Sequence, residues 1–257
     1  METVVYQVEK DVAQIRLNRP ERLNAMVPQL VEELCVAFET AIRDEVRTAV
    51  LAGGERAFCA GHDLKHEDDA VSEAEERRRL ERIQDVTRLI RRAPFPVIAA
   101  VRGWALGGGC EFALCCDLVV AADDAIFGFP EVAVGLSVTG GISHVLPIAV
   151  GLAKAKELVL LGRRFTAVEA LNLGLVNTIV PSEEVEPRAL EMATELAHRP
   201  RHSLALAKCA LDRGPQVDLE TTLEGEVSSA LTTRGTPDAV RAAEEFRQRS
   251  VLRSGVS

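Results

Sequence analysis

Residues 96–118 read PVIAAVRGWALGGGCEFALCCDL, and this stretch decides the fold of the chain. VIAAV at 97–101 is a short, wholly apolar run, which is typical of a buried strand. Three glycines, Gly107 to Gly109, then open an almost wholly apolar segment that continues to Cys116. This pattern predicts a helix that is buried on all sides. A buried strand that leads through glycines into a buried helix is typical of an α/β protein.

Strands and helices alternate on both sides of this stretch. Two β-branched runs at 3–8 and 12–17 are separated by three polar residues and predict a hairpin. TAVLAGG at 48–54 predicts a compact strand that leads into a loop at Ala57–Leu64. Further strands are expected at 118–122, 125–129 and 175–180, and helices at about 28–43, 71–92, 142–150, 153–161 and 166–174.

After about residue 182 the pattern predicts helices alone, among them one that begins at Thr236-Pro237. The chain is therefore expected to fold as an α/β core followed by an α-helical tail. The tail, from about residue 195 to 257, has too few apolar residues to form a core by itself. We expect it to pack on the core of its own chain or on a neighbouring subunit.

Composition and charge disfavour several classes of protein. The chain has 257 residues, of which 47% are hydrophobic and 27% charged, which suits one large domain and argues against disorder. Its 30 basic and 39 acidic residues give a formal net charge of -9, so nucleic acid is not an expected partner. The charged run at 71–92 is interpreted as a solvated helix face.

The cysteines and the N-terminal segment bear on the cellular compartment. Five of the six cysteines lie in or beside apolar stretches, so we expect reduced, buried thiols and no disulfides. The first residues lack the features of a signal peptide, and no apolar run reaches the ~18 residues of a membrane helix. The expectation is a cytoplasmic protein without a membrane partner.

Two glycine-containing turns are candidates for an anion site. The first is Ala57 to Leu64, directly after a strand, and the second is Ala105 to Glu111, which joins a strand to the buried helix. A glycine-rich turn into a helix exposes backbone N–H groups at the positive end of the helix. Two such turns brought together would direct two N–H groups at one oxygen and form an oxyanion hole. Neither turn has the spacing of a nucleotide-binding loop.

Two carboxylates stand in apolar surroundings. Glu111 falls in the first turn of the buried helix, and Glu131 lies between Phe127-Gly128-Phe129-Pro130 and Val132. A buried carboxylate is costly unless it is paired or used, and such sites are where acid and base pKa values are tuned. The residues alone leave alternatives open: Glu111 as a partner of the helix dipole, and Glu131 as an ordinary surface loop residue.

These features together resemble the crotonase, or enoyl-CoA hydratase/isomerase, superfamily over nearly the whole chain. The motifs follow in the family's order and at its spacing: Asn18-Arg19-Pro20 with Asn24-Ala25, Ala57 to Leu64, Pro96 to Val101 with Gly103, Ala105 to Glu111, Cys116-Asp117-Leu118, Phe127-Gly128 with Pro130-Glu131-Val132, Gly135, and Leu173 to Val176. The resemblance implies a crotonase-type spiral of β-β-α units over residues 1–195 and a C-terminal helical trimerisation region over 196–257. It also implies a homotrimer or a homohexamer.

In this family two backbone N–H groups hold the thioester oxygen of an acyl-CoA and stabilise an enolate. The matching residues here are His62, acting through its backbone, and Gly108. In the family's hydratases two glutamates flank the attacking water, and Glu111 and Glu131 fill both positions. The resemblance therefore implies an enoyl-CoA hydratase, a lyase of lipid metabolism. The alternatives are an enoyl-CoA isomerase, another enolate-forming enzyme of the superfamily, or a non-catalytic acyl-CoA-binding protein.

CoA binding in the family uses the backbone around both turns and basic side chains at the channel mouth. The matching residues are Arg22, Leu23, Ala60, Asp63, Leu64 and Gly107. Arg22 and Lys65 are candidate phosphate partners, and Phe246 is a candidate contribution from a neighbouring subunit. CoA enters as part of the substrate, so no cofactor is expected. No metal is expected either, because the histidines lack convincing partners.

The segment after Glu131 departs from the pattern of many hydratases. Their Pro-Gly-x-Gly-Gly is replaced here by LSVTGG, Leu136 to Gly141. This segment borders the acyl end of the pocket in the family, and Val138-Thr139 adds bulk and a hydroxyl group there. We therefore expect either an acyl preference different from straight-chain crotonyl-CoA or a different reaction.

Overall fold

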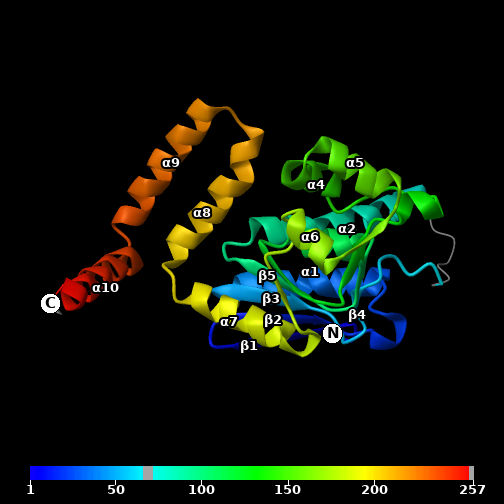
Figure 1. The fold of residues 1–257 in the computed structure, drawn as a ribbon, viewed down its shortest axis with the longest axis horizontal. Helices are drawn as coiled ribbons and strands as arrows, with labels where there is room; N and C mark the ends of the chain where they lie inside the picture. The colour runs from blue at the N-terminus through cyan, green and yellow to red at the C-terminus, as the bar shows by residue number, and fades with distance from the viewer. Residues whose placement is uncertain (66–71, 255–257) are drawn as a thin grey trace.

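A six-stranded sheet runs through the molecule, of which the computed structural model describes residues 1–65 and 72–254 (Figure 1). In spatial order the sheet consists of β1 (Val4–Glu9), β2 (Val12–Leu17), β3 (Thr48–Ala52), β5 (Val97–Val101), β7 (Leu118–Ala122) and β10 (Thr178–Val180). β1 and β2 form the predicted antiparallel hairpin, and the remaining neighbours pair in parallel. β3 and β5 are buried along their whole length, as parallel strands covered on both faces are.

Only one strand of the second, four-stranded sheet is predicted by the sequence, the strand at 125–129. The sheet consists of β4 (Ala57–Cys59), β6 (Trp104–Leu106), β8 (Ile126–Gly128) and β9 (Arg164–Thr166). The prediction of a loop over Ala57–Leu64 is wrong for its first three residues, which form β4. Strands of three residues are too short to show an alternating pattern, so pairing with neighbours defines them.

Successive turns of the chain place one strand in each sheet and then form a helix. β3, β5 and β7 enter the six-stranded sheet, and β4, β6 and β8 follow them into the smaller one. The helices that follow are α2 (Glu73–Arg92), α3 (Gly108–Cys115) and α4 (Ile142–Val150). This is the expected spiral of β-β-α units. Because β4 and β6 pair in parallel, their carboxyl ends lie side by side.

The other helices cover the sheets or continue beyond them. They are α1 (Pro28–Arg43), α5 (Leu152–Leu160), α6 (Ala167–Asn172), α7 (Val185–Ala197), α8 (Arg201–Arg213), α9 (Leu219–Arg234) and α10 (Pro237–Ser254). α1 has the predicted bounds, and all eight residues of α3 are buried, as predicted. The helix predicted at 71–92 begins at Glu73, and Val71 lies outside the described residues.

β10 is shorter than the strand predicted at 175–180 because Asn177 uses its side chain in the pairing. The N–H of Asn177 donates to the Val119 carbonyl oxygen at 2.9 Å, while its Oδ1 accepts from the Val119 N–H at 2.7 Å. A side-chain oxygen therefore stands where a strand would use its own carbonyl, and regular pairing begins one residue later, at Thr178.

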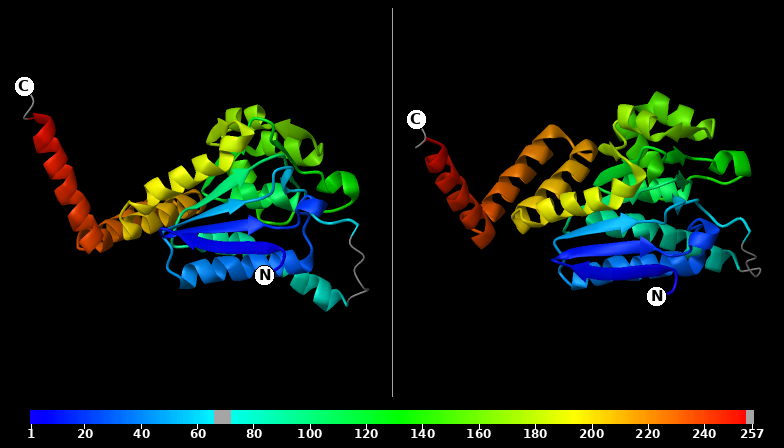
Figure 2. Two further views of the ribbon diagram at one scale, coloured as in Figure 1. Left: turned by 90° about the horizontal axis from the view of Figure 1, so that it is seen from below. Right: turned by 60° about the horizontal axis from the view of Figure 1, so that its bottom comes forward.

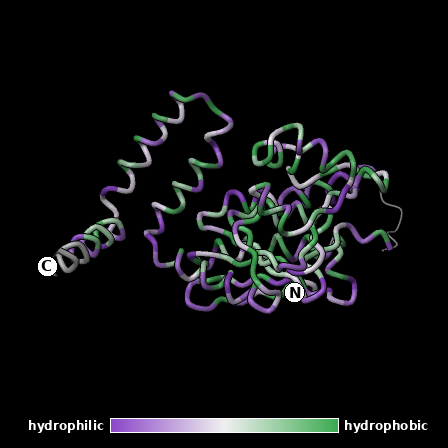
Figure 3. The backbone as a smooth tube through the Cα atoms, in the orientation of Figure 1, coloured by the Kyte–Doolittle hydropathy of each residue, from purple (hydrophilic) through white to green (hydrophobic). Residues whose placement is uncertain are grey.

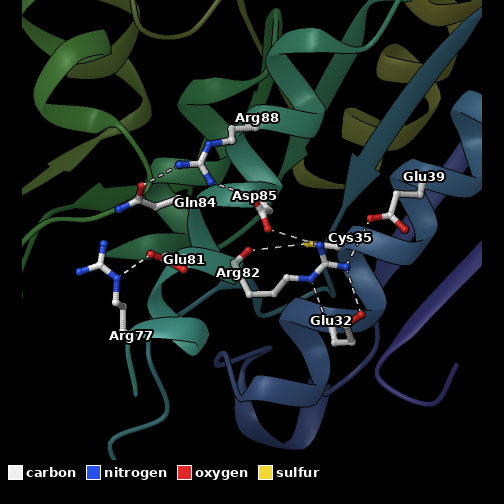
Figure 4. Close-up of polar contacts among 9 residues, drawn as sticks. All are labelled: Glu32, Cys35, Glu39, Arg77, Glu81, Arg82, Gln84, Asp85 and Arg88. Carbon is white, nitrogen blue, oxygen red and sulfur yellow. Dashed lines mark hydrogen bonds and ion pairs between the residues drawn. The ribbon is translucent and has the colours of Figure 1, made fainter. Parts of the chain in front are cut away.

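Helix α2 is tied to α1 by ion pairs, which extends the prediction of a merely solvated face (Figure 4). Arg82 reaches from α2 to α1, where Nε lies 2.8 Å from Glu32 and Nη2 lies 3.3 Å from Glu39. Within α2, Arg77 pairs with Glu81 at 2.8 Å. These arginines are occupied by carboxylates, in keeping with a chain of net negative charge.

Helix α8 is attached to the core by a buried amine. Nζ of Lys208 donates to the Ile90 carbonyl at 2.8 Å, to the Phe95 carbonyl at 3.1 Å and to Oδ2 of Asp117 at 2.7 Å. α7 packs on β3 and β5 and continues to Ala197, across the predicted boundary at 195/196. The division into a core and a C-terminal region stays a prediction.

Helices α9 and α10 extend away from the sheets (Figures 1 and 2). α10 begins at Pro237 as predicted, and its Ala239 N–H is capped by the Thr236 hydroxyl at 3.3 Å. Apolar and polar residues alternate along this part of the chain (Figure 3). Among the described helices, none combines the length and the apolar character that crossing a membrane requires.

Candidate active site

The two glycine-containing turns lie against each other at the ends of β4 and β6. A Cβ atom on Gly61 would lie 2.9 Å from the Leu106 carbonyl oxygen and 3.6 Å from Cα of Gly107. The φ angles of Gly61 and Gly107 are +89° and +53°, in the region that favours glycine. Close approach and backbone conformation therefore both require glycine at these two positions.

The two N–H groups expected to form an oxyanion hole have no hydrogen-bond acceptor within the described part of the chain. Gly108 is the first residue of α3, where an N–H lacks an acceptor in its own helix. His62 forms a parallel bridge with Met26, whose N–H and carbonyl bond to Gly61 and Asp63. This pattern leaves the N–H of His62 unused, and its side chain is exposed.

Glu111 is fully buried, and Thr139 binds both of its carboxylate oxygens. Oε1 accepts from the Thr139 N–H at 2.8 Å, and Oε2 is 3.0 Å from the Thr139 hydroxyl. Burial raises the pKa of Glu111 to about 7; the charge of Glu131 adds to the rise, and the hydrogen bonds from Thr139 oppose it. The segment 136–141 therefore binds the Glu111 carboxylate through Thr139. The alternative in which Glu111 only interacts with the dipole of α3 does not account for these contacts.

Glu131 begins the short 3-10 helix η2 (Glu131–Val134) and is 8% exposed. Its Oε2 is buried and has no hydrogen-bond partner among the described residues. Burial raises the pKa of this carboxyl too. The alternative of an ordinary surface residue is therefore wrong for Glu131.

The two carboxyl groups approach adjacent residues of the second turn. A Cβ atom on Gly107 would lie 2.9 Å from Oε1 of Glu131, and one on Gly108 would lie 3.8 Å from Oε2 of Glu111. Two buried carboxyl groups in one site disfavour the state in which both are ionised. A pair with one proton can act as acid and base at once.

Most of the residues predicted to bind CoA lie beside the first turn. The Leu23 carbonyl accepts from the Ala60 N–H at 3.1 Å, which joins the loop around Arg22 to this turn. Arg22, Leu64 and Lys65 are exposed, Leu23 and Ala60 are half-buried, and Gly107 is buried. Phe246 is 74% exposed on α10, which extends away from the sheets, so this chain does not bring it to its own site.

Arg19 is a supporting residue to which the sequence analysis assigned no role beyond its place in the Asn18-Arg19-Pro20 motif. Its Nη1 and Nη2 both lie 3.2 Å from Oδ2 of Asp63, and its guanidinium also donates to the Ala25 carbonyl. Burial tends to raise the pKa of Asp63, but hydrogen bonds from the Lys65 N–H and Arg19 lower it overall. The Asp63 side chain thus already accepts hydrogen bonds from Arg19 and from the Lys65 N–H. Its role in CoA binding stays a prediction.

A cleft of about 500 Å³ opens beside His62 between α1 and α2. Met26, Val31 and Ile83 are among its apolar lining residues, and α2 also contributes charged side chains, among them Glu75 and Arg78. Sδ of Met26 would lie 3.1 Å from a Cβ on Gly108, so the cleft adjoins the second turn. The cleft thus lies beside both glycine-containing turns.

The cysteines lie outside this chemistry. Five of them are buried and free, as predicted, and Cys209 is exposed. Burial raises the pKa of the Cys59 thiol to about 12, so it is neutral at physiological pH. In residues 1–65 and 72–254, no group of three or more His, Cys, Asp or Glu side chains could hold a metal ion.

Comparison with known proteins gives relatives that cover almost the whole chain. The family model described as enoyl-CoA hydratase/isomerase matches residues 7–248. A Dictyostelium discoideum protein named as a probable mitochondrial enoyl-CoA hydratase is 37% identical over 237 residues, covering 91% of this chain and 84% of that protein. The crystal structure of an enoyl-CoA hydratase from Bacillus anthracis has a TM-score of 0.90 at 35% identity, with 96% of each chain covered. That of a Mycobacterium smegmatis enoyl-CoA hydratase has a TM-score of 0.90 at 32% identity, with 97% of each covered.

Proposed function

The chain belongs to the enoyl-CoA hydratase/isomerase family, and we propose that it is an enoyl-CoA hydratase. The reaction is the reversible addition of water across the 2,3 double bond of an enoyl-CoA thioester. The observation that carries the proposal is that Glu111 and Glu131, both buried, converge on the turn that presents the Gly108 N–H. Hydration needs a base for water and an acid for carbon, and this pair supplies both.

The proposed mechanism begins with the thioester oxygen on the N–H groups of His62 and Gly108. As the water oxygen bonds to C3, the double bond opens and negative charge moves to the thioester oxygen as an enolate. One ionised glutamate takes the proton of the water, and the protonated glutamate gives its proton to C2. Each N–H donor is worth about 3–4 kcal/mol of transition-state stabilisation by analogy with other oxyanion holes. No cofactor is needed in this scheme, since CoA is part of the substrate.

A second candidate is an enoyl-CoA isomerase or another enolate-forming enzyme. It is favoured by the fact that Thr139 occupies both oxygens of Glu111, whereas Oε2 of Glu131 has no partner among the described residues. An isomerase could move a proton between C2 and C4 with Glu131 alone. Each carboxylate oxygen accepts two hydrogen bonds, however, so Glu111 still has room for a water. A non-catalytic acyl-CoA-binding protein is a weaker candidate, because it has no use for two costly buried carboxyls.

Absorbance of the conjugated thioester tests the proposal. A panel of short-chain, branched and aromatic 2-enoyl-CoA substrates is followed with the wild-type protein, Glu111→Gln and Glu131→Gln. A hydratase loses absorbance with the wild type, and each variant is slower by about 10²–10⁴-fold while acyl-CoA still binds. An isomerase instead gains absorbance from 3-enoyl-CoA and depends only on Glu131. Tight acyl-CoA binding without any absorbance change would point to the non-catalytic candidate.

A homotrimer or homohexamer is part of the same proposal. Leu219, Leu223, Val227 and Leu231 recur every four residues on α9 and are between 44% and 69% exposed. Such an apolar stripe on a helix is expected to be covered by a partner. Light scattering after size exclusion measures the mass; a monomer would contradict this part.

A cytoplasmic location is also proposed, and cell fractionation with immunodetection tests it.

A further inference from the structure

We propose that Thr139 is a positioning residue for proton transfer, and that its hydroxyl holds Oε2 of Glu111 whether this carboxyl is ionised or protonated. Thr139 acts through Glu111, so the inference rests on the proposed function. Its basis is a two-point contact in which one residue supplies the N–H to Oε1 and the hydroxyl to Oε2. The contact joins α3 to the loop that replaces the Pro-Gly-x-Gly-Gly of many hydratases.

The two contacts differ in what they permit. A backbone N–H only donates, so Oε1 of Glu111 is an acceptor in every state and any proton resides on Oε2. A hydroxyl donates to an ionised Oε2 and accepts from a protonated one by rotating its hydrogen. Glu111 therefore keeps both partners when it takes a proton from water and when it returns it. A valine here would keep only the first contact.

The Thr139 backbone has little freedom to move away from Glu111. The carbonyl of the next residue, Gly140, accepts from the Thr87 hydroxyl at 2.7 Å and from Sγ of Cys115 at 3.4 Å. These bonds attach the loop to α2 and α3. Threonine is also β-branched and therefore restricted at χ1. The hydroxyl is thus held in place before substrate arrives.

The hydrogen bonds that lower the pKa of Glu111 come from Thr139. Among the described residues, Glu131 on η2 is the charge that acts on Glu111, and it favours the protonated form. The thiols of Cys110 and Cys115 on α3 are buried, with pKa values raised by burial, and stay neutral. Arg91 on α2 is paired with Asp212 on α8 at 2.7 Å, and His144 on α4 is exposed.

The test compares Thr139→Val with Thr139→Ser. Valine keeps the shape and the N–H contact but removes the hydroxyl, whereas serine keeps the hydroxyl. For Thr139→Val we expect kcat to fall about 10-fold with KM unchanged, because a hydrogen bond to a charged group is lost. The acidic limb of the kcat–pH profile should move up by about one pH unit, because the bond that the hydroxyl donates to the ionised carboxylate is stronger than the bond that it accepts from the protonated carboxyl. Thr139→Ser should stay within about twofold of the wild type. If the limb of Thr139→Val coincides with that of the wild type, or if both variants are equally impaired, the inference is wrong.

A second readout separates this inference from the proposed function. Protein labelled with ¹³C at the glutamate carboxyls is titrated by NMR, and Glu111→Gln identifies the Glu111 resonance. The midpoint of this resonance should rise in Thr139→Val and not in Thr139→Ser, whichever reaction the protein catalyses. A shifted midpoint in a protein that hydrates nothing would refute the hydratase alone. An unshifted midpoint in an active hydratase would refute the role of Thr139 alone. Thr139→Ala replaces the valine variant if the latter does not fold.

Discussion

A Cβ atom on Gly140 would lie 2.7 Å from Oε2 of Glu111 and 2.9 Å from the Glu111 Cβ. The backbone at Gly140 cannot easily give way, because its carbonyl is bound by Thr87 and Cys115. Any side chain at this position must therefore displace the glutamate. The position of the Glu111 carboxylate therefore requires glycine at 140 as well as the hydrogen bonds from Thr139.

Gly140→Ala is accordingly expected to lower kcat by about 10²-fold, because small misplacements of a catalytic group cost that much. Binding of a saturated acyl-CoA, measured by calorimetry, should be nearly unchanged. Gly225→Ala is the matched control: Gly225 lies in α9, where a Cβ meets nothing within 4 Å. Equal kcat values for Gly140→Ala and the control would contradict the role of this contact.

Glu111→Gln should be more stable than the wild type at alkaline pH. Burial raises the pKa of Glu111 from 4.5 to about 7 in the folded protein, so folding favours the protonated form. The contribution of Glu111 to wild-type stability is therefore full below about pH 4.5, falls as pH rises to about 7 and is constant above. The free energy of unfolding should change by ~3 kcal/mol over this pH range because of Glu111.

Urea denaturation at pH 5 and pH 8 measures this difference. Glutamine does not titrate, so the advantage of Glu111→Gln over the wild type should be larger at pH 8 than at pH 5. Glu157→Gln is the control, since Glu157 is exposed on α5. A Glu111→Gln advantage that is the same at both pH values would show that the carboxyl does not titrate between them.

Lys208→Met should destabilise the protein by about 3–5 kcal/mol, because it leaves Asp117 and two carbonyls without their buried partner. Lys154→Met is the matched control, since Lys154 forms an exposed pair with Glu157 at the same 2.7 Å. The control should cost less than about 1 kcal/mol. Denaturant midpoints measure both, and equal losses would mean that burial does not set the value of the Lys208 pair.

Arg19→Lys should reduce hydration activity about 10-fold while the protein stays folded. Lysine keeps the charge but loses the planar fork that holds Asp63 and the Ala25 carbonyl together. The turn that presents the His62 N–H then loses the contact that Asp63 makes with the guanidinium. Arg22→Lys, at an exposed neighbouring position, is the control for charge near CoA. A kcat/KM for Arg19→Lys within twofold of the wild type would show that the turn holds its shape without this pair.

The parts of the site that the sequence predicts are those whose residue types conflict with their surroundings. Glycines in a row and carboxylates in apolar stretches can be recognised locally, and Glu111 and Glu131 do lie together. The short strands of the second sheet leave no local pattern because only their neighbours define them. The contact between Thr139 and Glu111 spans 28 positions, so the sequence shows the added hydroxyl but not what it binds. For the same reason the sequence does not show that Lys208 binds Asp117 or that Arg19 binds Asp63.

The site is built from two kinds of structure, the turns that follow β4 and β6 and the segment between η2 and α4. The N–H groups of His62 and Gly108 belong to turns that follow β4 and β6 of the four-stranded sheet, so the fold itself places them. The segment from Leu136 to Gly141 only connects η2 to α4, yet it governs the carboxyl at Glu111. In the proposed reaction, the thioester oxygen is therefore bound by backbone that the fold places, whereas proton transfer depends on side chains held by this loop. Substitutions in this loop are therefore expected to change proton transfer and to leave the backbone of the two turns in place.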